Sequence, residues 1–305
     1  MASSGPWPPA SYEDWSESCD TLHAHTQVLG KIAAKLAPPE PQLQHAALRL
    51  SGRGWETAPL PAADGSGALV VALDLHSHEA VVEHSDGRAR RLPLPDRAVG
   101  EVTRELLAAV SELAGVVEID PAPQEVTWTV PLDEDTEHAT YEPQHVETYF
   151  RMATLAADVL AELRAPWRGR STPVNAWWGS FDLAVSFFSG LPAEPPSDDF
   201  IMRNAGDVQQ VEVGWWPGSP GYTRAAFFGF VLPSPDGLEE LDASPGHWDS
   251  ALGEFVFDWR DAAASEDPRA ASLSFSRTVA RESFAACGWD PELAATLDGK
   301  PPPVV

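Results

Sequence analysis

Cysteine, basic residues and long apolar runs are all scarce in this chain of 305 residues. Its two cysteines, Cys19 and Cys287, are too few for a disulfide framework and form no Cys-x-x-Cys metal motif. No apolar run reaches the roughly 18 residues that a membrane-spanning helix needs. The first residues, MASSGPWPPASYEDW, contain neither a basic start nor an apolar stretch, so no secretory signal is expected and a cytoplasmic location is predicted.

The chain carries 20 basic against 46 acidic residues, and its formal charge of −26 repels nucleic acids and anionic membranes. Nucleic acid and membranes are therefore not expected as partners. The partners that stay open are a small-molecule substrate and a further protein subunit. An acidic mimic of DNA stays open as an alternative, and solubility alone is the simpler explanation of the charge. The 43% hydrophobic content, with 12 Trp and 12 Phe, indicates a globular protein with a substantial core.

Helical and strand-like patterns follow one another in the same order twice. The first array is a helix over 20–36, strands over 46–50, 55–58, 68–75, 80–84 and 88–92, and a helix over 97–113. After an acidic connector over 119–143, the second array is a helix over 145–163, strands over 174–188, 211–216, 222–232 and 254–259, and a helix over 268–286. The sequence thus predicts an α+β protein of two pseudo-repeats, residues 1–120 and 121–305. Each would be a mainly antiparallel sheet with flanking helices, and the two would meet at a shared cleft.

The most informative segment is TPVNAWWGSFDLAVSFFSG, residues 172–190, which carries one charge, Asp182. Read as a continuous strand, this segment places Trp178, Ser180 and Asp182 on one face, opposite an apolar face. A buried carboxylate costs roughly several kcal/mol unless a cation or several donors meet it. Asp182 is therefore predicted to be buried on a strand and to need a partner from elsewhere in the chain.

The predicted duplication suggests such a partner. Aligning the two arrays through Gln42 and Asn175 puts His45 on Trp178 and Arg49 on Asp182. Identity is low under this alignment, which depends on element order and apolar alternation alone. If the alignment holds, Arg49 is the counter-charge of Asp182, and His45 joins the same polar row.

Several segments resemble an uncharacterised actinobacterial family that shares a WGSFDLAV-type core. They are TLHAHTQVLGK (21–31), LAPPEPQLQH (36–45), PLDEDTEHATYEP (131–143), WGSFDLAVSFFSG (178–190) and WWPGSPGYTRAAFFGF (215–230). The resemblance extends over most of the chain and implies no known activity. Typical members of that family place histidines where this chain has Asn175 and Gln42, and a His-Glu pair where it has Val208-Gln209. The resemblance thus implies a divergent member, in which any metal or acid–base site built on those histidines is lost.

Other motifs are better explained by structure than by chemistry. The nine histidines include no H-x-x-x-H or H-E-x-x-H spacing, so no metal and no cofactor are expected, and His25 is interpreted as a packing residue. The acidic run 133–137 lacks the glycine of a calcium loop and is interpreted as a solvated loop that caps the next helix. Ser180 lies outside a G-x-S-x-G elbow, which argues against a hydrolase nucleophile.

These residues predict a metal-independent enzyme, or an enzyme subunit, that acts on a small molecule by proton transfer or intramolecular substitution. The most concrete form is attack by an amine with loss of a sulfate-like group, an aziridine-type ring closure in actinobacterial specialised metabolism. The alternative is a non-catalytic acidic scaffold or partner subunit. The predicted catalytic residues are Asp182, Ser180 and His45. The predicted substrate-binding residues are Arg49, Asn175, Trp178, Arg203, Glu212 and Trp216.

Overall fold

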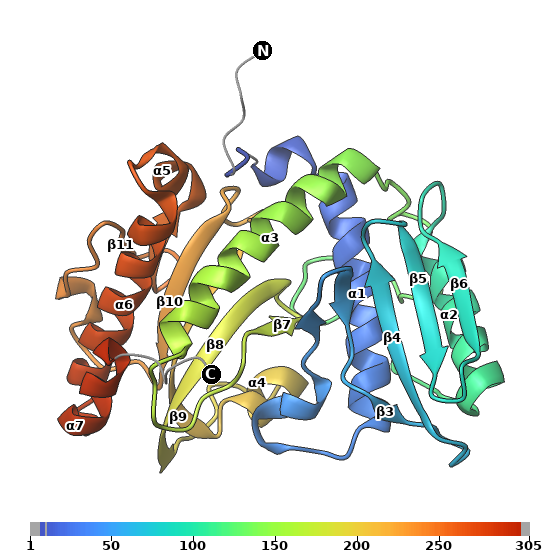
Figure 1. The fold of residues 1–305 in the computed structure, drawn as a ribbon, viewed down its shortest axis with the longest axis horizontal. Coiled ribbons are helices and arrows are strands. Elements are labelled where there is room, and N and C mark those ends of the chain that lie inside the picture. The colour runs from blue at the N-terminus through green and yellow to red at the C-terminus, as the bar shows by residue number, and fades with distance from the viewer. Residues whose placement is uncertain (1–6, 10, 300–305) are drawn as a thin grey trace, which may run out of the picture. The chain divides into compact units, whose positions relative to one another are not determined.

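The computed structural model describes residues 7–9 and 11–299 and has an α+β fold with two antiparallel sheets (Figure 1). Residues 1–6 and 10, which belong to the segment in which no secretory signal is expected, lie outside the described residues, as do 300–305. The chain divides into two units. The N-terminal unit comprises Glu13–Phe150 and Asn175–Phe181, and the C-terminal unit comprises the residues up to Tyr12, Arg151–Val174 and the chain from Asp182 onward. Neither unit coincides with residues 1–120 or 121–305, and the two pseudo-repeats stay a prediction.

The N-terminal unit is built on an antiparallel sheet of six short strands. These are β1 (Arg49–Leu50), β2 (Gly54–Glu56), β3 (Leu60–Pro61), β4 (Ala68–Asp74), β5 (Glu79–His84) and β6 (Ala89–Pro93). Their spatial order is β1-β2-β4-β5-β6, and β3 also pairs with β4. Because consecutive strands are neighbours, short turns suffice to connect most of them, such as Ser85-Asp86-Gly87 between β5 and β6.

Helices cover one face of this sheet. Helix α1 (Ser16–Leu36) contacts β4, and α2 (Val99–Ala114) contacts β5 and β6. The apolar stripe of α1, including Leu22, Leu29 and Ile32, is fully buried, as the helical spacing of these residues predicts. Two 3-10 helices, η1 (Tyr12–Asp14) and η2 (Pro41–Ala46), flank α1, and α3 (Pro143–Arg164) begins in this unit.

The C-terminal unit contains a second antiparallel sheet. Its strands are β8 (Asp182–Pro192), β9 (Val208–Trp216), β10 (Ala226–Leu232), β11 (His247–Asp249) and β12 (Glu254–Asp258), in the spatial order β11-β12-β10-β9-β8. Its further helices are α4 (Phe200–Ala205), η3 (Leu238–Glu240), α5 (Trp259–Ala264), α6 (Pro268–Ala286), α7 (Pro291–Ala294) and η4 (Ala295–Asp298).

Helix α6 covers one face of the second sheet and lies alongside β9 and β10 (Figure 1). A Cβ atom at Gly229 of β10 would lie 2.5 Å from Val279 of α6, so the missing side chain allows the helix to approach the strand closely. Gly229 pairs with Val213 of β9 and Phe255 of β12, which therefore face α6 as well. Since side chains alternate along a strand, the residues next to these three face the other side of the sheet.

The predicted continuous strand over 174–188 is wrong. The segment consists of β7 (Asn175–Trp177), a turn over 178–181, and β8, which starts at Asp182. Phe181 has a φ of 59°, and its ring stacks on those of His23, Trp55 and Tyr149 at centroid distances of 4.9, 5.3 and 5.1 Å. The aromatic cluster of the N-terminal unit thus holds Phe181 in a left-handed conformation, which ends the period-two alternation before Asp182.

Most other predicted elements are confirmed. The predicted helices over 20–36, 97–113 and 268–286 correspond to α1, α2 and α6, and the last agrees at both ends. Strands β3 and β11 and helices α4, α5 and α7 were not predicted, because two to six residues are too few to show a periodicity. Within residues 7–9 and 11–299, no helix combines the length and apolarity needed to cross a membrane.

Candidate functional site

A row of polar side chains crosses the face of the second sheet that points away from α6. Ser186 of β8 pairs with Glu212 of β9, Glu212 pairs with Phe230 of β10, and Asp249 of β11 pairs with Glu254 of β12. Directly paired residues share a face, and the register of β10 against β12 aligns Phe230 with Glu254. We call Ser186, Glu212, Glu254 and Asp249 the acidic row.

The two glutamates of the acidic row titrate near neutrality. Burial raises the pKa of Glu212 from 4.5 to about 7, against the opposing effect of its hydrogen bond from the Ser186 hydroxyl. Burial also raises the pKa of Glu254 from 4.5 to about 7, and the charges of Glu212 and Asp249 raise it further. A carboxyl group with a pKa near 7 can both accept and donate a proton at neutral pH, which is what general acid–base catalysis requires.

Two further predicted site residues lie on the same face of this sheet. Asp182 and Ser186 are four residues apart on β8, so their side chains point to the same side, and Trp216 is likewise four residues from Glu212 on β9. Asp182 is buried, with 4% of its surface exposed, as predicted. The Trp216 ring is partly buried and lies 5.2 Å from Phe228 and 5.4 Å from Tyr222. The strand register therefore brings Asp182, Glu212 and Trp216 to one surface.

Arg203 is placed differently. It lies in the short helix α4 of the same unit, where its side chain is exposed. It has no ion-pair partner in the part of the chain that the structure describes. Its predicted role in binding an anion stays a prediction.

In the N-terminal unit, Arg49 and Asn175 are joined directly. The backbones of Leu48 and Ala176 pair, and Arg49 Nη1 donates to Asn175 Oδ1 and, over 3.3 Å, to the Leu48 carbonyl. The fully buried Asn175 in turn donates through Nδ2 to Gln44 Oε1 at 3.0 Å. Two residues predicted to bind substrate thus form one polar chain, although they are far apart in sequence.

The guanidinium of Arg49 keeps free donors. Both of its hydrogen bonds use Nη1, so Nε and Nη2 have no hydrogen-bond partner in the described part of this unit. Burial lowers the pKa of Arg49, and the charge of Glu40 opposes this effect. The Nε–Nη2 edge is the edge of arginine that binds carboxylates and phosphates through two hydrogen bonds. Asp182 belongs to the other unit, so its pairing with Arg49 stays a prediction.

Three predicted site residues do not have the environment that the sequence suggested. His45 lies in η2 rather than on a strand, and its Nδ1 accepts a hydrogen bond from the Glu40 backbone N–H at 3.0 Å. Gln42 and Leu43, just before His45, both have a φ of 53°, a left-handed conformation that interrupts an extended backbone, so His45 does not join a polar row along a strand. Ser180 lies in the turn before β8 and is exposed, so it does not continue the row of Asp182 along a strand.

Trp178, predicted to bind substrate, lies in the same turn and packs against α1. Its indole is 3% exposed, and a Cβ atom at Gly30 of α1 would lie 2.1 Å from it. His23 Nε2 lies 3.0 Å from the Trp178 carbonyl and 2.9 Å from that of Gly179, so it must donate to these acceptors. Burial lowers the pKa of His23 to about 4, which keeps this imidazole neutral at pH 7. Helix α1 therefore holds the turn at two places. Gly30 packs against the Trp178 indole, and His23 binds the backbone carbonyls of Trp178 and Gly179.

Sequence reasoning missed an aspartate–histidine pair. Asp135 Oδ2 lies 2.6 Å from His138 Nδ1, and its Oδ1 accepts from the backbone N–H groups of Glu137 and His138 at 2.9 and 3.0 Å. The Asp135 side chain is fully buried, whereas that of His138 is 14% exposed. A buried carboxylate that receives Nδ1–H leaves Nε2 as the proton acceptor, the arrangement of an oriented general base. The spacing of Asp135 and His138 in DEDTEH was the available signal.

Most of run 133–137 is a solvated loop, as interpreted, since Glu134, Thr136 and Glu137 are exposed, but the helix that its backbone is seen to cap is the preceding one. The backbone carbonyls of Asp135 and His138 accept hydrogen bonds from Gly100 and Val99, at 2.8 and 2.9 Å, at the start of α2. The N-cap residue of α2, Ala98, has no side-chain acceptor, so backbone groups of the loop take that role. The loop therefore caps the preceding helix, and this contact buries Asp135.

Within residues 7–9 and 11–299, no group of three or more His, Cys, Asp or Glu side chains is arranged to hold a metal ion. The two sheets with their flanking helices define the class as α+β. The model of a family of unknown function, DUF5996, matches residues 7–296, and the chain belongs to this family. No curated protein and no solved structure matches the chain.

Proposed function

We propose that this protein is a metal-independent enzyme, or a subunit of one, that transfers a proton on a small molecule at the acidic row. The supporting observation is the pair Glu212 and Glu254, whose pKa values are both raised to about 7 on one face of one sheet. Carboxyl groups with strongly perturbed pKa values are characteristic of catalytic sites, although structural groups also show them.

The chemistry of the acidic row favours a substrate with an amine. Carboxylates attract a protonated amine, and the rings of Trp216 and Phe228 on the same face can contact its apolar part. Glu212, oriented by the Ser186 hydroxyl, is ionised and accepts the proton of the amine. Glu254 stays protonated during this step. Asp182, which is predicted to be catalytic, lies further along the same face and is proposed here as a second base.

The concrete reaction proposed from the sequence is intramolecular substitution. The amine nitrogen forms a bond to carbon, the bond from that carbon to a sulfate-like group breaks with its electron pair, and the amine proton passes to a carboxylate. The cation proposed to hold the departing anion is Arg203, which is predicted to bind substrate and belongs to the same unit as the acidic row. Arg49 belongs to the other unit, and its role in binding substrate stays a prediction. A place in actinobacterial specialised metabolism belongs to this proposal.

The test is a thermal-shift screen of the purified protein against amines, amino acids and their sulfated and phosphorylated forms. A hit should be weakened in Glu212→Gln and retained in Glu266→Gln, since Glu266 is an exposed glutamate of the same unit. With a turnover assay for that hit, Glu212→Gln should lose roughly 10²- to 10⁴-fold in rate. If no small molecule shifts the melting temperature and one protein is captured equally by both variants, the non-catalytic scaffold is the better explanation.

A further inference from the structure

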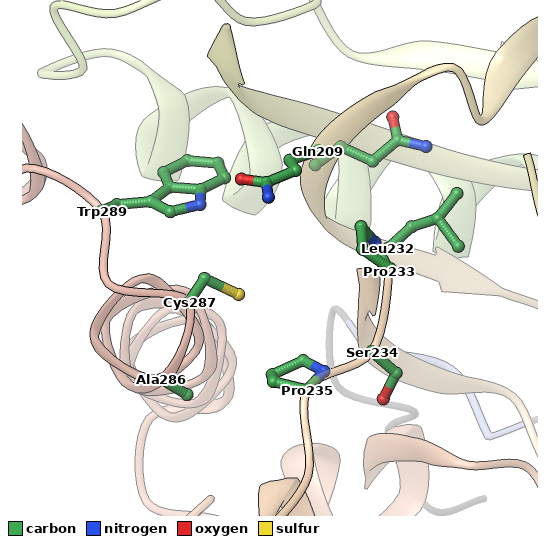
Figure 2. Close-up of a pocket in the computed structure, with 9 residues that line it drawn as sticks. Gln209, Leu232, Pro233, Ser234, Pro235, Ala286, Cys287 and Trp289 are labelled. Atoms are coloured by element: carbon green, nitrogen blue, oxygen red, sulfur yellow. The ribbon is translucent and has the colours of Figure 1, made fainter. Parts of the chain in front are cut away.

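A cavity of about 220 Å³ lies in the C-terminal unit, between the end of α6 and the ends of β9 and β10 (Figure 2). It shares no residue with the acidic row. Its lining consists of Gln209, Gln210, Leu232, Pro233, Ser234, Pro235, Ala286, Cys287 and Trp289. Figure 2 shows the Trp289 ring and the Cys287 side chain on the α6 side, facing Gln209 and Pro235 of the strand side.

The cavity contains an unused hydrogen-bond donor. Trp289 is 8% exposed, and its Nε1 has no hydrogen-bond partner in the part of the chain that the structure describes. The ring is held in place, because it stacks on Phe284 at 4.6 Å and contacts Trp167 at 6.4 Å. A buried N–H group without an acceptor is unfavourable, and a ligand that supplies an acceptor removes this cost.

A second hydrogen-bond donor, the side-chain amide of Gln209, lies in the same lining. Gln209 Oε1 accepts a hydrogen bond from the Ser189 hydroxyl at 3.1 Å, which orients the amide, and its Nε2 has no partner among the described residues. Apolar contacts come from Leu232, Pro233 and Pro235, and the lining also contains the polar side chains of Gln210 and Ser234. The site therefore offers the two donors of Trp289 and Gln209 beside an apolar wall.

The lining also limits the charge of a ligand. None of its residues is charged, in a chain whose formal charge is −26. An anion would find no cation in this lining, and a cation would find no carboxylate, so either would lose part of its hydration without gaining an opposite charge. A neutral ligand avoids this cost. This separates the cavity from the acidic row, which is suited to an amine.

The volume limits the size. A cavity of roughly 150 Å³ holds one benzene molecule, so a cavity of about 220 Å³ has room for a ring with one small substituent. We propose that this cavity binds a neutral monocyclic molecule with a carbonyl or similar acceptor, which receives the Trp289 Nε1–H. The site is separate from the proposed reaction centre and does not depend on it.

Cys287 provides the readout. It is partly buried in the lining, while Cys19 is buried elsewhere and burial raises its pKa well above the usual value. In a Cys19→Ala background, modification of Cys287 by a disulfide reagent should slow when the cavity is filled. Benzamide is the test ligand, benzoate has the same shape with a charge, and toluene has the ring without an acceptor. Benzamide at millimolar concentration should protect Cys287, toluene less, and benzoate not at all.

Two variants test the geometry. Trp289→Phe keeps an aromatic ring and removes the donor. It should weaken the binding of benzamide about tenfold and leave the binding of toluene unchanged. The matched control Trp248→Phe, on β11, should change neither. Ala286→Trp at the exposed rim should abolish protection by both ligands. Absence of protection by benzamide, equal protection by benzoate, or equal benzamide affinity in Trp289→Phe would each overturn the proposal.

Discussion

Replacing Glu212 by glutamine should stabilise the protein in alkaline solution and leave it unchanged in acid. Glutamine has the shape of the protonated glutamate, remains neutral at every pH and can keep a hydrogen bond with Ser186. The variant therefore removes the ionised form of Glu212 and leaves the rest of the site in place.

The sign follows from proton binding. The pKa of Glu212 is 4.5 in the unfolded chain and about 7 in the folded one, so between these values the folded state binds more protons. The free energy of unfolding then falls as pH rises through this window, and the loss is complete above about pH 7. Glu254 adds to the loss, because its pKa is raised in the same direction and partly by the charge of Glu212.

The magnitude is bounded by the size of the shift. A rise from 4.5 to about 7 corresponds to about 3 kcal/mol between the two protonation states. Glu212 keeps some exposure to solvent, and its charge also acts on Glu254. We therefore expect Glu212→Gln to raise the free energy of unfolding by about 1 to 2 kcal/mol. The free energy of unfolding of Glu212→Gln should thus exceed that of the wild type by this amount at about pH 8.5, and the two should be equal at about pH 4.5.

Urea unfolding of both proteins across this pH range measures the difference directly. His23 and His25 act in the opposite sense, because burial lowers both pKa values to about 4, but their effect cancels between variant and wild type. The control Glu266→Gln should give no pH-dependent difference, and Ser186→Ala should steepen the loss, because it removes the hydrogen bond that lowers the pKa of Glu212. If Glu212→Gln is the less stable protein at about pH 8.5, the ionised carboxylate stabilises the fold and the reasoning is wrong.

Three further predictions concern the N-terminal unit. Gly30→Ala should cost about 1 to 3 kcal/mol of stability, because the clash with Trp178 outweighs the gain of about 1 kcal/mol that alanine gives within a helix. Asn175→Ala should cost about 1 to 3 kcal/mol, because it leaves Arg49 and Gln44 without their buried partner. His25→Gln should reduce the loss of stability on acidification, because the folded-state pKa of His25, lowered by burial to about 4, makes its protonation unfavourable below the unfolded value of 6.5. Urea denaturation measures all three, the last between about pH 7 and pH 4.

Each of these has its own comparison. Gly52→Ala is the control for Gly30, since a Cβ atom there meets no described atom within 4 Å, and equal effects of the two changes would contradict the clash. Gln44→Ala should cost less than Asn175→Ala, because Gln44 is partly exposed. If the stability of His25→Gln falls on acidification as steeply as that of the wild type, the imidazole of His25 does not cause the loss.

The regular elements could be predicted from the sequence because their signals are local. The apolar stripe of Leu22, Leu29 and Ile32 predicts α1, and the Pro268 start of α6 predicts its first residue. The alternation of Asp182 and Ser186 with apolar neighbours gives the correct faces of β8, and it also predicts the burial of Asp182. In each case, neighbouring residues carry enough information to fix the backbone or the face.

The candidate site depended on contacts that local patterns do not contain. Glu212, Glu254 and Asp249 form a row only because of the register of four strands, and burial within that sheet raises the pKa values of the two glutamates. Phe181 interrupts the alternation because rings from distant residues stack on it, which no period-two pattern can show.

The sequence by itself determined the α+β class, the long helices and the alternating faces of the strands, since propensity and periodicity act over a few residues. Tertiary structure alone decided that His45 lies in a 3-10 helix, that Asp135 orients His138, and that Arg49 meets Asn175. Hydrogen bonds and ring stacking between distant segments can outweigh local preference by about 1 kcal/mol each, and several of them act at each of these positions.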